Sequence, residues 1–171
     1  SLADVAAADG VVTLREAIEA ANTNLAVNEA PAGSQSDVDE VSFDMSLFAF
    51  GPASIVLSGS ELAIVDDLRI EGPGGDLLSI DAVRRSRVFR IEGNGTDVAL
   101  DGLTITGGSA PEGAGLFISD GSLALTNSTV SWNYAEAGGQ STTCGGGIYV
   151  SGGTVTLADT AITHNQAHGE N

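Results

Sequence analysis

From residue 41 onward, apolar and polar residues alternate in short runs that are separated by Gly, Asp or Asn. Such runs predict half-buried β-strands of about three to five residues. Residues 13–22 differ, because their apolar side chains are spaced three and four apart, as on one face of a helix. Thr13 and Glu16 have the spacing of a capping box, so we expect the helix to begin there. Residues 23–40 are polar and acidic, and we expect a loop.

The strand pattern repeats along the chain. Residues 113–135 align without a gap on residues 145–167, with matching glycines, Asn and apolar residues. Looser copies cover residues 89–105 and residues 55–70. Strands this short are unstable alone, so we expect the copies to stack, strand on strand, about 4.8 Å apart around an aliphatic core. The pattern predicts an all-β fold, a right-handed parallel β-helix with three sheets and about four rungs.

Two regions follow from this pattern. Residues 1–50 are expected to form an N-terminal cap that holds the helix of residues 13–22, the acidic loop and the first strand. Residues 51–171 are expected to form the rungs, whose first open end the helix covers. The C-terminus carries no comparable cap, so we expect either a longer natural chain or a last rung covered by another subunit.

Composition and charge limit the kind of core that the chain can form and the partners that it can bind. Hydrophobic residues make up 42% of the chain but aromatic residues only 5%, so the core must be aliphatic. The chain has 23 acidic residues, six arginines and no lysine, with a formal net charge of −17 at pH 7. A field of this sign disfavours nucleic acid and anionic membranes as partners. No apolar run reaches the roughly 18 residues of a membrane span, so we expect none in this segment.

Several segments resemble known β-helix families. TLREAIEAAN, followed by an acidic loop and VSF, resembles the SLREAI-type N-terminal motif of bacterial secreted β-helix proteins. IEGPGG, RVFRIEG and LDGLTITGG are similar to segments that follow in that family. GAGLF and GGGIY resemble repeats of chlamydial polymorphic outer-membrane proteins, although Val130 and Ile162 replace the Phe of their FxxN motif. The resemblance implies a pectin-lyase-like fold and a secreted or cell-surface, autotransporter-like protein, but no single reaction, since β-helices have many functions.

The first strand of each rung predicts a column of outward side chains. Because the flanking apolar residues point inward, Arg90, Phe117 and Tyr149 should point outward and stack about 4.8 Å apart. A guanidinium beside two rings suits cation–π contact and a carbohydrate-binding platform. The alternative is stacking that only stiffens the sheet.

The densest acidic group comprises four residues, Asp37, Asp39, Glu40 and Asp44. Carboxylates at this spacing suit Ca²⁺, but the segment matches neither an EF-hand nor a glycine-rich nonapeptide repeat. A solvated loop is therefore the preferred interpretation, and we expect no cofactor other than possible Ca²⁺.

Asn133 and Asn165 end the third strand of their rungs at equivalent positions. An Asn there suits a tight turn of positive φ and an amide bonded to the neighbouring rung, which predicts a structural ladder. His164 and His168 are four residues apart but lie on a strand end and a tail, so they do not resemble a metal-binding pair on one helix face.

The sequence contains no clear set of catalytic residues. The basic cluster consists of Arg84, Arg85, Arg87 and Arg90. A β-helix lyase uses such a base beside acids that hold Ca²⁺, but no acidic trio accompanies Arg90. A hydrolase needs two carboxylates roughly 6.5–9.5 Å apart on one face, and the first strands offer no acidic column.

We therefore expect a secreted or cell-surface module with a structural or adhesive display role. Its partner would be a polysaccharide or the surface of a host or neighbouring cell, and the insert at residues 136–144 would vary the contact. Two alternatives remain open. One is a carbohydrate-active enzyme, a polysaccharide lyase or hydrolase that uses Arg90. The other is a self-assembling extracellular filament, a homo-oligomer with end-to-end contact at the last rung.

Overall fold

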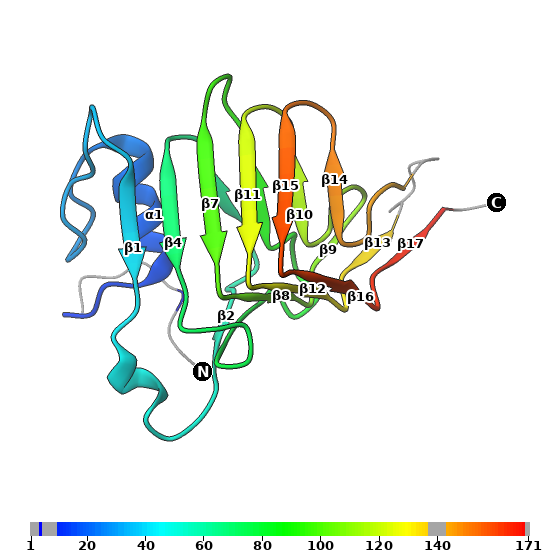
Figure 1. The fold of residues 1–171 in the computed structure, drawn as a ribbon, viewed down its shortest axis with the longest axis horizontal. Helices are drawn as coiled ribbons and strands as arrows, with labels where there is room; N and C mark the ends of the chain where they lie inside the picture. The colour runs from blue at the N-terminus through cyan, green and yellow to red at the C-terminus, as the bar shows by residue number, and fades with distance from the viewer. Residues whose placement is uncertain (1–3, 5–9, 137–142, 170–171) are drawn as a thin grey trace.

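Parallel pairing between successive turns of the chain builds the fold. The computed structural model describes residues 4, 10–136 and 143–169. This part of the chain is an all-β parallel solenoid with one α-helix and one short 3-10 helix, η1 (Met45–Phe48). Successive turns visit three of the sheets in the same order, and the later turns add strands of a fourth, so strands of successive turns lie side by side (Figure 1).

Two five-stranded sheets run along the solenoid. The front sheet has the order β1 (Asp39–Ser42), β4 (Leu68–Glu71), β7 (Asp97–Asp101), β11 (Ser122–Thr126) and β15 (Thr154–Ala158). The lower sheet has the order β2 (Ala53–Val56), β5 (Leu78–Asp81), β8 (Thr104–Thr106), β12 (Thr129–Ser131) and β16 (Ala161–Thr163).

Two smaller sheets complete the solenoid, and the second of them is formed only by the later described turns. The rear sheet has the order β3 (Leu62–Ile64), β6 (Phe89–Ile91), β10 (Leu116–Ile118) and β14 (Ile148–Val150). The short sheet has the order β9 (Ser109–Ala110), β13 (Tyr134–Glu136) and β17 (Gln166–His168). The sequence predicted three sheets, and the structure has four. The strands of the short sheet carry only an alanine at their equivalent positions, Ala110, Ala135 and Ala167, instead of a pair of large aliphatic residues, so the alternating pattern does not reveal them.

The register is continuous through the last turns. Leu123 of β11 pairs with Val98 of β7 on one side and with Val155 of β15 on the other. Leu116 pairs with Ile148, and Val130 pairs with Ile162. The predicted alignment of the last two copies is therefore confirmed.

The earlier turns are phased differently from the prediction. The sequence grouped residues 55–70 as one copy that begins with Ile55. In the structure Leu62 pairs with Phe89, so the first strand of that turn is β3. Ile55 instead pairs with Ile80 of β5, a strand that the sequence did not predict. Short aliphatic strands resemble one another, and the turns differ in length. The sequence therefore does not show at which strand each turn begins.

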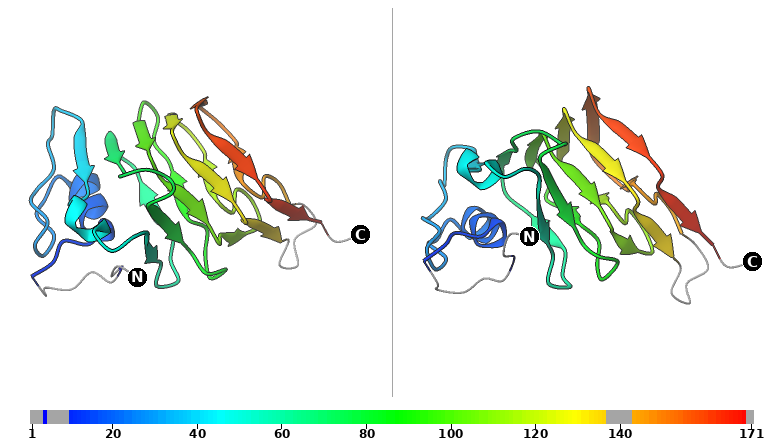
Figure 2. Two further views of the ribbon diagram at one scale, coloured as in Figure 1. Left: turned by 60° about the horizontal axis from the view of Figure 1, so that its bottom comes forward. Right: turned by 90° about the horizontal axis from the view of Figure 1, so that it is seen from below.

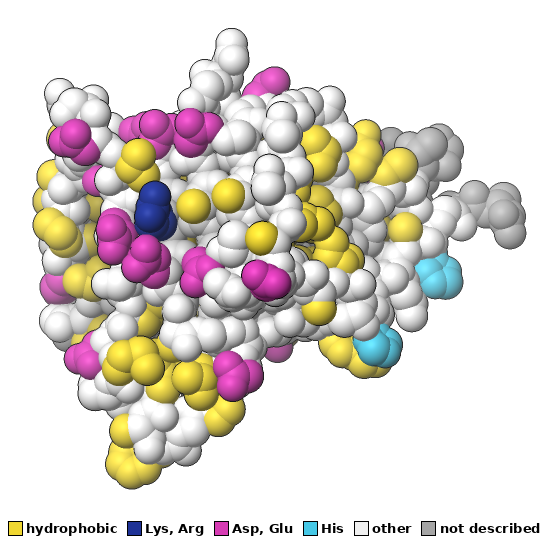
Figure 3. Space-filling view, viewed as in Figure 1, with side chains coloured by type: hydrophobic (Ala, Val, Ile, Leu, Met, Phe, Trp, Pro, Cys, Tyr) yellow, Lys and Arg dark blue, Asp and Glu magenta, His cyan; other side chains and the backbone are white. Residues whose placement is uncertain are grey.

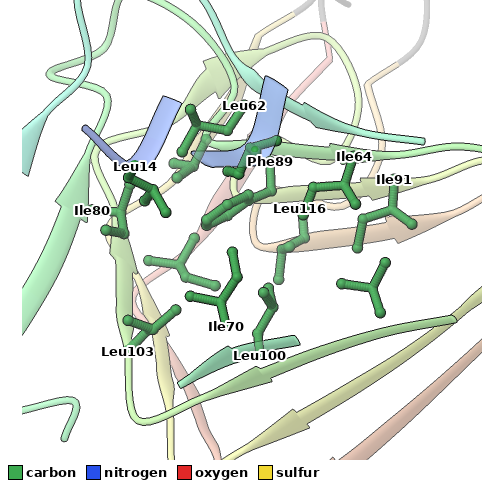
Figure 4. Packing of buried hydrophobic residues seen from close by; sticks show 14 of the residues in the cluster. Leu14, Leu62, Ile64, Ile70, Ile80, Phe89, Ile91, Leu100, Leu103 and Leu116 are labelled. Carbon is green, nitrogen blue, oxygen red and sulfur yellow. The ribbon is translucent and has the colours of Figure 1, made fainter. Parts of the chain in front are cut away.

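Inward side chains of the three longer sheets form one aliphatic core. Those that are fully buried include Ile64, Ile70, Ile80, Phe89, Leu100, Ile105, Leu116, Leu125 and Val130. Figure 4 shows Phe89 among the surrounding Leu and Ile side chains. In the last described turn Val150, Leu157 and Ile162 are 42%, 45% and 48% exposed, although their register partners one turn earlier are fully buried.

The predicted helix is present as α1 (Leu14–Thr23). The Thr13 hydroxyl accepts the N–H of Glu16 at 3.2 Å, and the Glu16 carboxylate accepts the N–H of Thr13 at 2.8 Å, which completes the capping box. Leu14 and Ile18 belong to the core cluster. In the described part of the chain no helix is both long and apolar enough to span a membrane.

Polar side chains of α1 form hydrogen bonds with the edge strand of the rear sheet, β3, at one end of the solenoid (Figure 2). Asn22 donates through Nδ2 to the carbonyl of Ala63 at 2.8 Å, and its Oδ1 accepts the N–H of Val65 at 2.9 Å. Arg15 Nη1 donates to the carbonyl of Glu61 at 3.0 Å. Asn22 thus supplies the donor and acceptor that a neighbouring strand would offer, which satisfies the otherwise open edge of β3.

Asn133 is fully buried and joins three turns of the solenoid. Its Oδ1 accepts the N–H of Gly108 at 2.8 Å, and its Nδ2 donates to the carbonyl of Ile105 at 3.1 Å and to Asn165 Oδ1 at 3.0 Å. A Cβ at Gly115 would lie 2.9 Å from Asn133 Nδ2, so the amide requires a glycine there. The bonds between rungs follow the expected ladder.

The positive φ expected for the two ladder asparagines falls on the residues that precede them. Trp132 has a φ of 58° and His164 a φ of 55°. The turn therefore places its left-handed residue one position before the Asn, which frees the amide to point into the solenoid.

Replacing Asn133 by Ala should lower the free energy of unfolding by about 3 kcal/mol, because it leaves the buried N–H of Gly108 without a partner and removes the side-chain hydrogen bonds to the carbonyl of Ile105 and to Asn165. Asn165→Ala is the matched control and should cost about 1 kcal/mol, since Asn165 is only partly buried. Urea unfolding followed by circular dichroism measures both. Equal losses would contradict a special role of Asn133.

Candidate functional site

The outward side chains of the rear sheet form the candidate site. The register places Phe117 directly between Arg90 and Tyr149, with Ala63 next to Arg90 on β3. The structure therefore brings together the three residues of the outward column, on neighbouring strands of one face.

Phe117 has ring or cation contacts with residues on two sides. Its ring centroid lies 5.7 Å from that of Tyr149, with an interplanar angle of 36°. The guanidinium carbon of Arg87 lies 4.8 Å from the Phe117 centroid, closer than that of Arg90 at 6.0 Å. Arg87 is thus the main cation–π partner of the ring.

Carboxylates form ion pairs with both of these arginines. Glu61 Oε2 lies 2.5 Å from Arg87 Nη1, and Glu61 Oε1 lies 3.5 Å from Arg90 Nη1. Arg90 also pairs with Glu92. Both oxygens of Glu61 are therefore engaged by cations, which leaves this carboxylate poorly placed to bind a metal ion or to accept a proton from a substrate.

Arg87 acts as the anchor of the site. Its side chain is only 14% exposed. Its Nε donates to the carbonyl of Gly113 at 3.0 Å, and its Nη2 donates to the carbonyl of Glu112 at 2.9 Å. The guanidinium thus joins the loop before β10 to Glu61 beside β3, and it holds the face in one geometry.

A hollow of about 190 Å³ lies beside this face, between α1 and β3. Arg15, Glu19 and Asn22 of α1 form one wall, and Glu61 and Ala63 form the other. Sites for small molecules commonly measure about 300–1,000 Å³. The site is therefore an extended surface with a shallow hollow at its edge, which suits a long polymer better than an enclosed small substrate.

Sequence reasoning missed Glu61 and Glu92, and it named Arg87 only as part of a basic cluster, not as a contact of Phe117. Glu92 lies two residues after Arg90, so alternation along the strand could have placed it on the same face. Glu61 and Arg87 precede their strands, and only the register of β3 with β6 places them together. The predicted copy of residues 55–70 began at the wrong strand, so the sequence did not show that β3 pairs with β6.

The four residues of the acidic group, Asp37, Asp39, Glu40 and Asp44, do not lie on one element. Asp37 lies in a loop, and Asp39 and Glu40 are neighbours on β1 that point to opposite faces. Asp44 caps η1, where the backbone N–H of Ser46 donates to Asp44 Oδ1 at 2.8 Å and lowers the pKa of that carboxyl. Among the described residues no three Asp, Glu, His or Cys side chains are grouped to hold a metal ion.

Most of the predicted contact insert at residues 136–144 lies outside the described residues, which end at Glu136 and resume at Thr143.

Replacing Arg87 by Met should lower the free energy of unfolding by about 2 kcal/mol, because Glu61 loses its close partner and two carbonyls lose their donor. Arg69→Met is the matched control. Its ion pair with Glu71 spans 3.9 Å between side chains that are 55% and 48% exposed, so we expect less than about 0.5 kcal/mol. Chemical denaturation of both variants tests this, and similar small effects would show that Arg87 is no anchor.

Comparison of the chain with models of protein families, with curated proteins and with solved structures found no match in any of the three.

Proposed function

We propose that this chain is a secreted or cell-surface module of right-handed parallel β-helix architecture, with a structural or adhesive display role. Two features support the architecture. The three longer sheets enclose one core, and α1 lies across the edge strand of the rear sheet as an N-terminal cap would. Crossovers between parallel strands are right-handed in nearly all proteins. The SLREAI-type motif at residues 13–22 supports the family and the location.

One observation carries the proposed role. The charged and aromatic groups of the rear face engage one another, with Glu61 between Arg87 and Arg90 and with Phe117 between Arg87 and Tyr149. A catalytic base or nucleophile needs a free group that is aimed at a substrate. Groups that are already paired instead make a rigid surface, which loses little conformational entropy when it binds a partner.

The chemistry of the surface supports a polysaccharide or a cell-surface glycan as the partner. The Phe117 and Tyr149 rings offer apolar faces, and the side chain of Arg90 is 41% exposed. The net charge of −17 opposes nucleic acid. A straight column across successive strands matches a linear polymer.

One observation favours self-assembly into a filament. Val150, Leu157 and Ile162 of the last described turn leave between 42% and 48% of their surface exposed. Apolar positions and open strand edges of this kind suit contact with another copy. A scattering mass that rises with protein concentration would favour the filament over the display module.

Replacing both Phe117 and Tyr149 by Ala should weaken retention on insoluble polysaccharides about tenfold, because each lost stacking contact contributes about 0.5–1.5 kcal/mol. A pull-down over a panel of cellulose, chitin, xylan and alginate measures the retained fraction.

Thr156→Ala is the matched control for this test, since Thr156 is exposed on the front sheet of the same turn as Tyr149. Its retention should equal that of the wild type. Unchanged retention in the double variant would refute the binding surface, and release of reducing or unsaturated sugar would indicate an enzyme instead.

A further inference from the structure

Aromatic and cationic side chains from three turns gather at the corner between the lower sheet and the short sheet. The Trp132 and His164 rings stack with centroids 4.5 Å apart and an interplanar angle of 13°. The Tyr134 and His168 rings lie 5.1 Å apart, and the guanidinium carbon of Arg84 lies 5.1 Å from the Tyr134 centroid. These five residues, here named the corner cluster, include the only tryptophan and both histidines of the chain. Figure 3 shows the two histidines on the surface at the lower right.

The backbone at this corner does not favour large side chains. Trp132 and His164 adopt left-handed φ angles of 58° and 55°, and the residue one turn earlier at this position is Gly107, with a φ of 67°. Gly, Asn, Asp and His adopt this conformation more readily than other residues, so His164 is tolerated there and Trp132 is the strained residue. Trp132 remains 58% exposed, so burial of the indole does not offset the strain. Strained conformations of this kind cluster at ligand-binding sites, so the exposed Trp132 ring is a candidate contact for a ligand.

The corner also holds a cationic group without an ion pair. Four of the six arginines pair with carboxylates, and these are Arg15, Arg69, Arg87 and Arg90. The other two, Arg84 and Arg85, are exposed and form no ion pair with any described residue, and of these Arg84 contacts the Tyr134 ring. In a chain with 23 acidic residues, a guanidinium without a carboxylate partner is available to an external anion.

We propose that the corner cluster is a second binding site, which takes an oligosaccharide that carries carboxylates. The apolar face of one sugar ring would lie on the Trp132 indole, and a carboxylate would accept hydrogen bonds from the Arg84 guanidinium. Single-stranded nucleic acid also suits rings and arginines, but its dense charge is repelled by a net charge of −17. The inference rests on the adhesive function proposed above and gives it a ligand class and a site on another face.

The test uses the single tryptophan as its reporter. Hyaluronan hexasaccharide, in which carboxylated and neutral sugars alternate, is titrated into the chain while tryptophan fluorescence is recorded. We expect a saturable change, because Trp132 is the only source of the signal. Chitohexaose, a neutral hexamer, should bind about tenfold more weakly, since it lacks the carboxylate.

Variants then assign the site. Arg84→Gln keeps the reporter and should weaken binding about tenfold. Trp132→Asn removes the ring but keeps a residue that tolerates a left-handed φ, so the turn is retained and calorimetry should show no binding. Arg69→Gln, which lies on the front sheet, should bind as the wild type does. The double variant of Phe117 and Tyr149 should also bind normally, which separates this inference from the rear-face surface.

Three results would overturn the inference. The first is an absence of fluorescence change and of heat at millimolar hexasaccharide. The second is undiminished binding in both Arg84→Gln and Trp132→Asn. The third is tighter binding of an oligothymidylate than of the hexasaccharide, which would identify a nucleic-acid site instead.

Discussion

In-register stacking of parallel strands is the constraint on which the rest of this structure depends. Each residue lies about 4.8 Å from its counterpart one turn away, whatever the length of the loop between them. Leu123, for example, pairs with Val98 on one side and with Val155 on the other, although the two connecting segments differ in length. Inward positions therefore merge into one aliphatic core, and outward positions merge into columns. A surface site in such a fold is a column rather than a pocket.

Polar side chains satisfy backbone groups at edges and corners where no strand pairs with them. Asn22 satisfies the free edge of β3, and Asn133 bonds to the turns on either side of its own. The Glu16 carboxylate, fully buried, completes the first turn of α1. Each of these groups is buried or bound at several atoms, so its loss would leave backbone groups unsatisfied. The aliphatic core stabilises the solenoid, and these few polar residues determine where its edges and corners lie.

The two candidate surfaces use similar side chains in opposite ways. On the rear face Glu61 neutralises Arg87 and Arg90, and the Phe117 ring lies between Arg87 and Tyr149. At the corner cluster the Arg84 guanidinium has no carboxylate partner among the described residues, and Trp132 is largely exposed in a strained conformation. The first arrangement stabilises the solenoid and presents a stiff face. The second retains unpaired charge and exposed rings, which a ligand can use.

Sequence alone determined the local features. Hydrophobic spacing and the capping pair Thr13 and Glu16 placed the helix, and alternation placed Arg90 and its neighbours on the outer face. Only the tertiary structure decided the phase of the early turns, the fourth sheet and the ion pairs of Glu61. Such short strands carry too little pattern to show which strand pairs with which. Those contacts join residues that lie a full turn of the solenoid apart in the sequence, and only the folded chain brings such residues together.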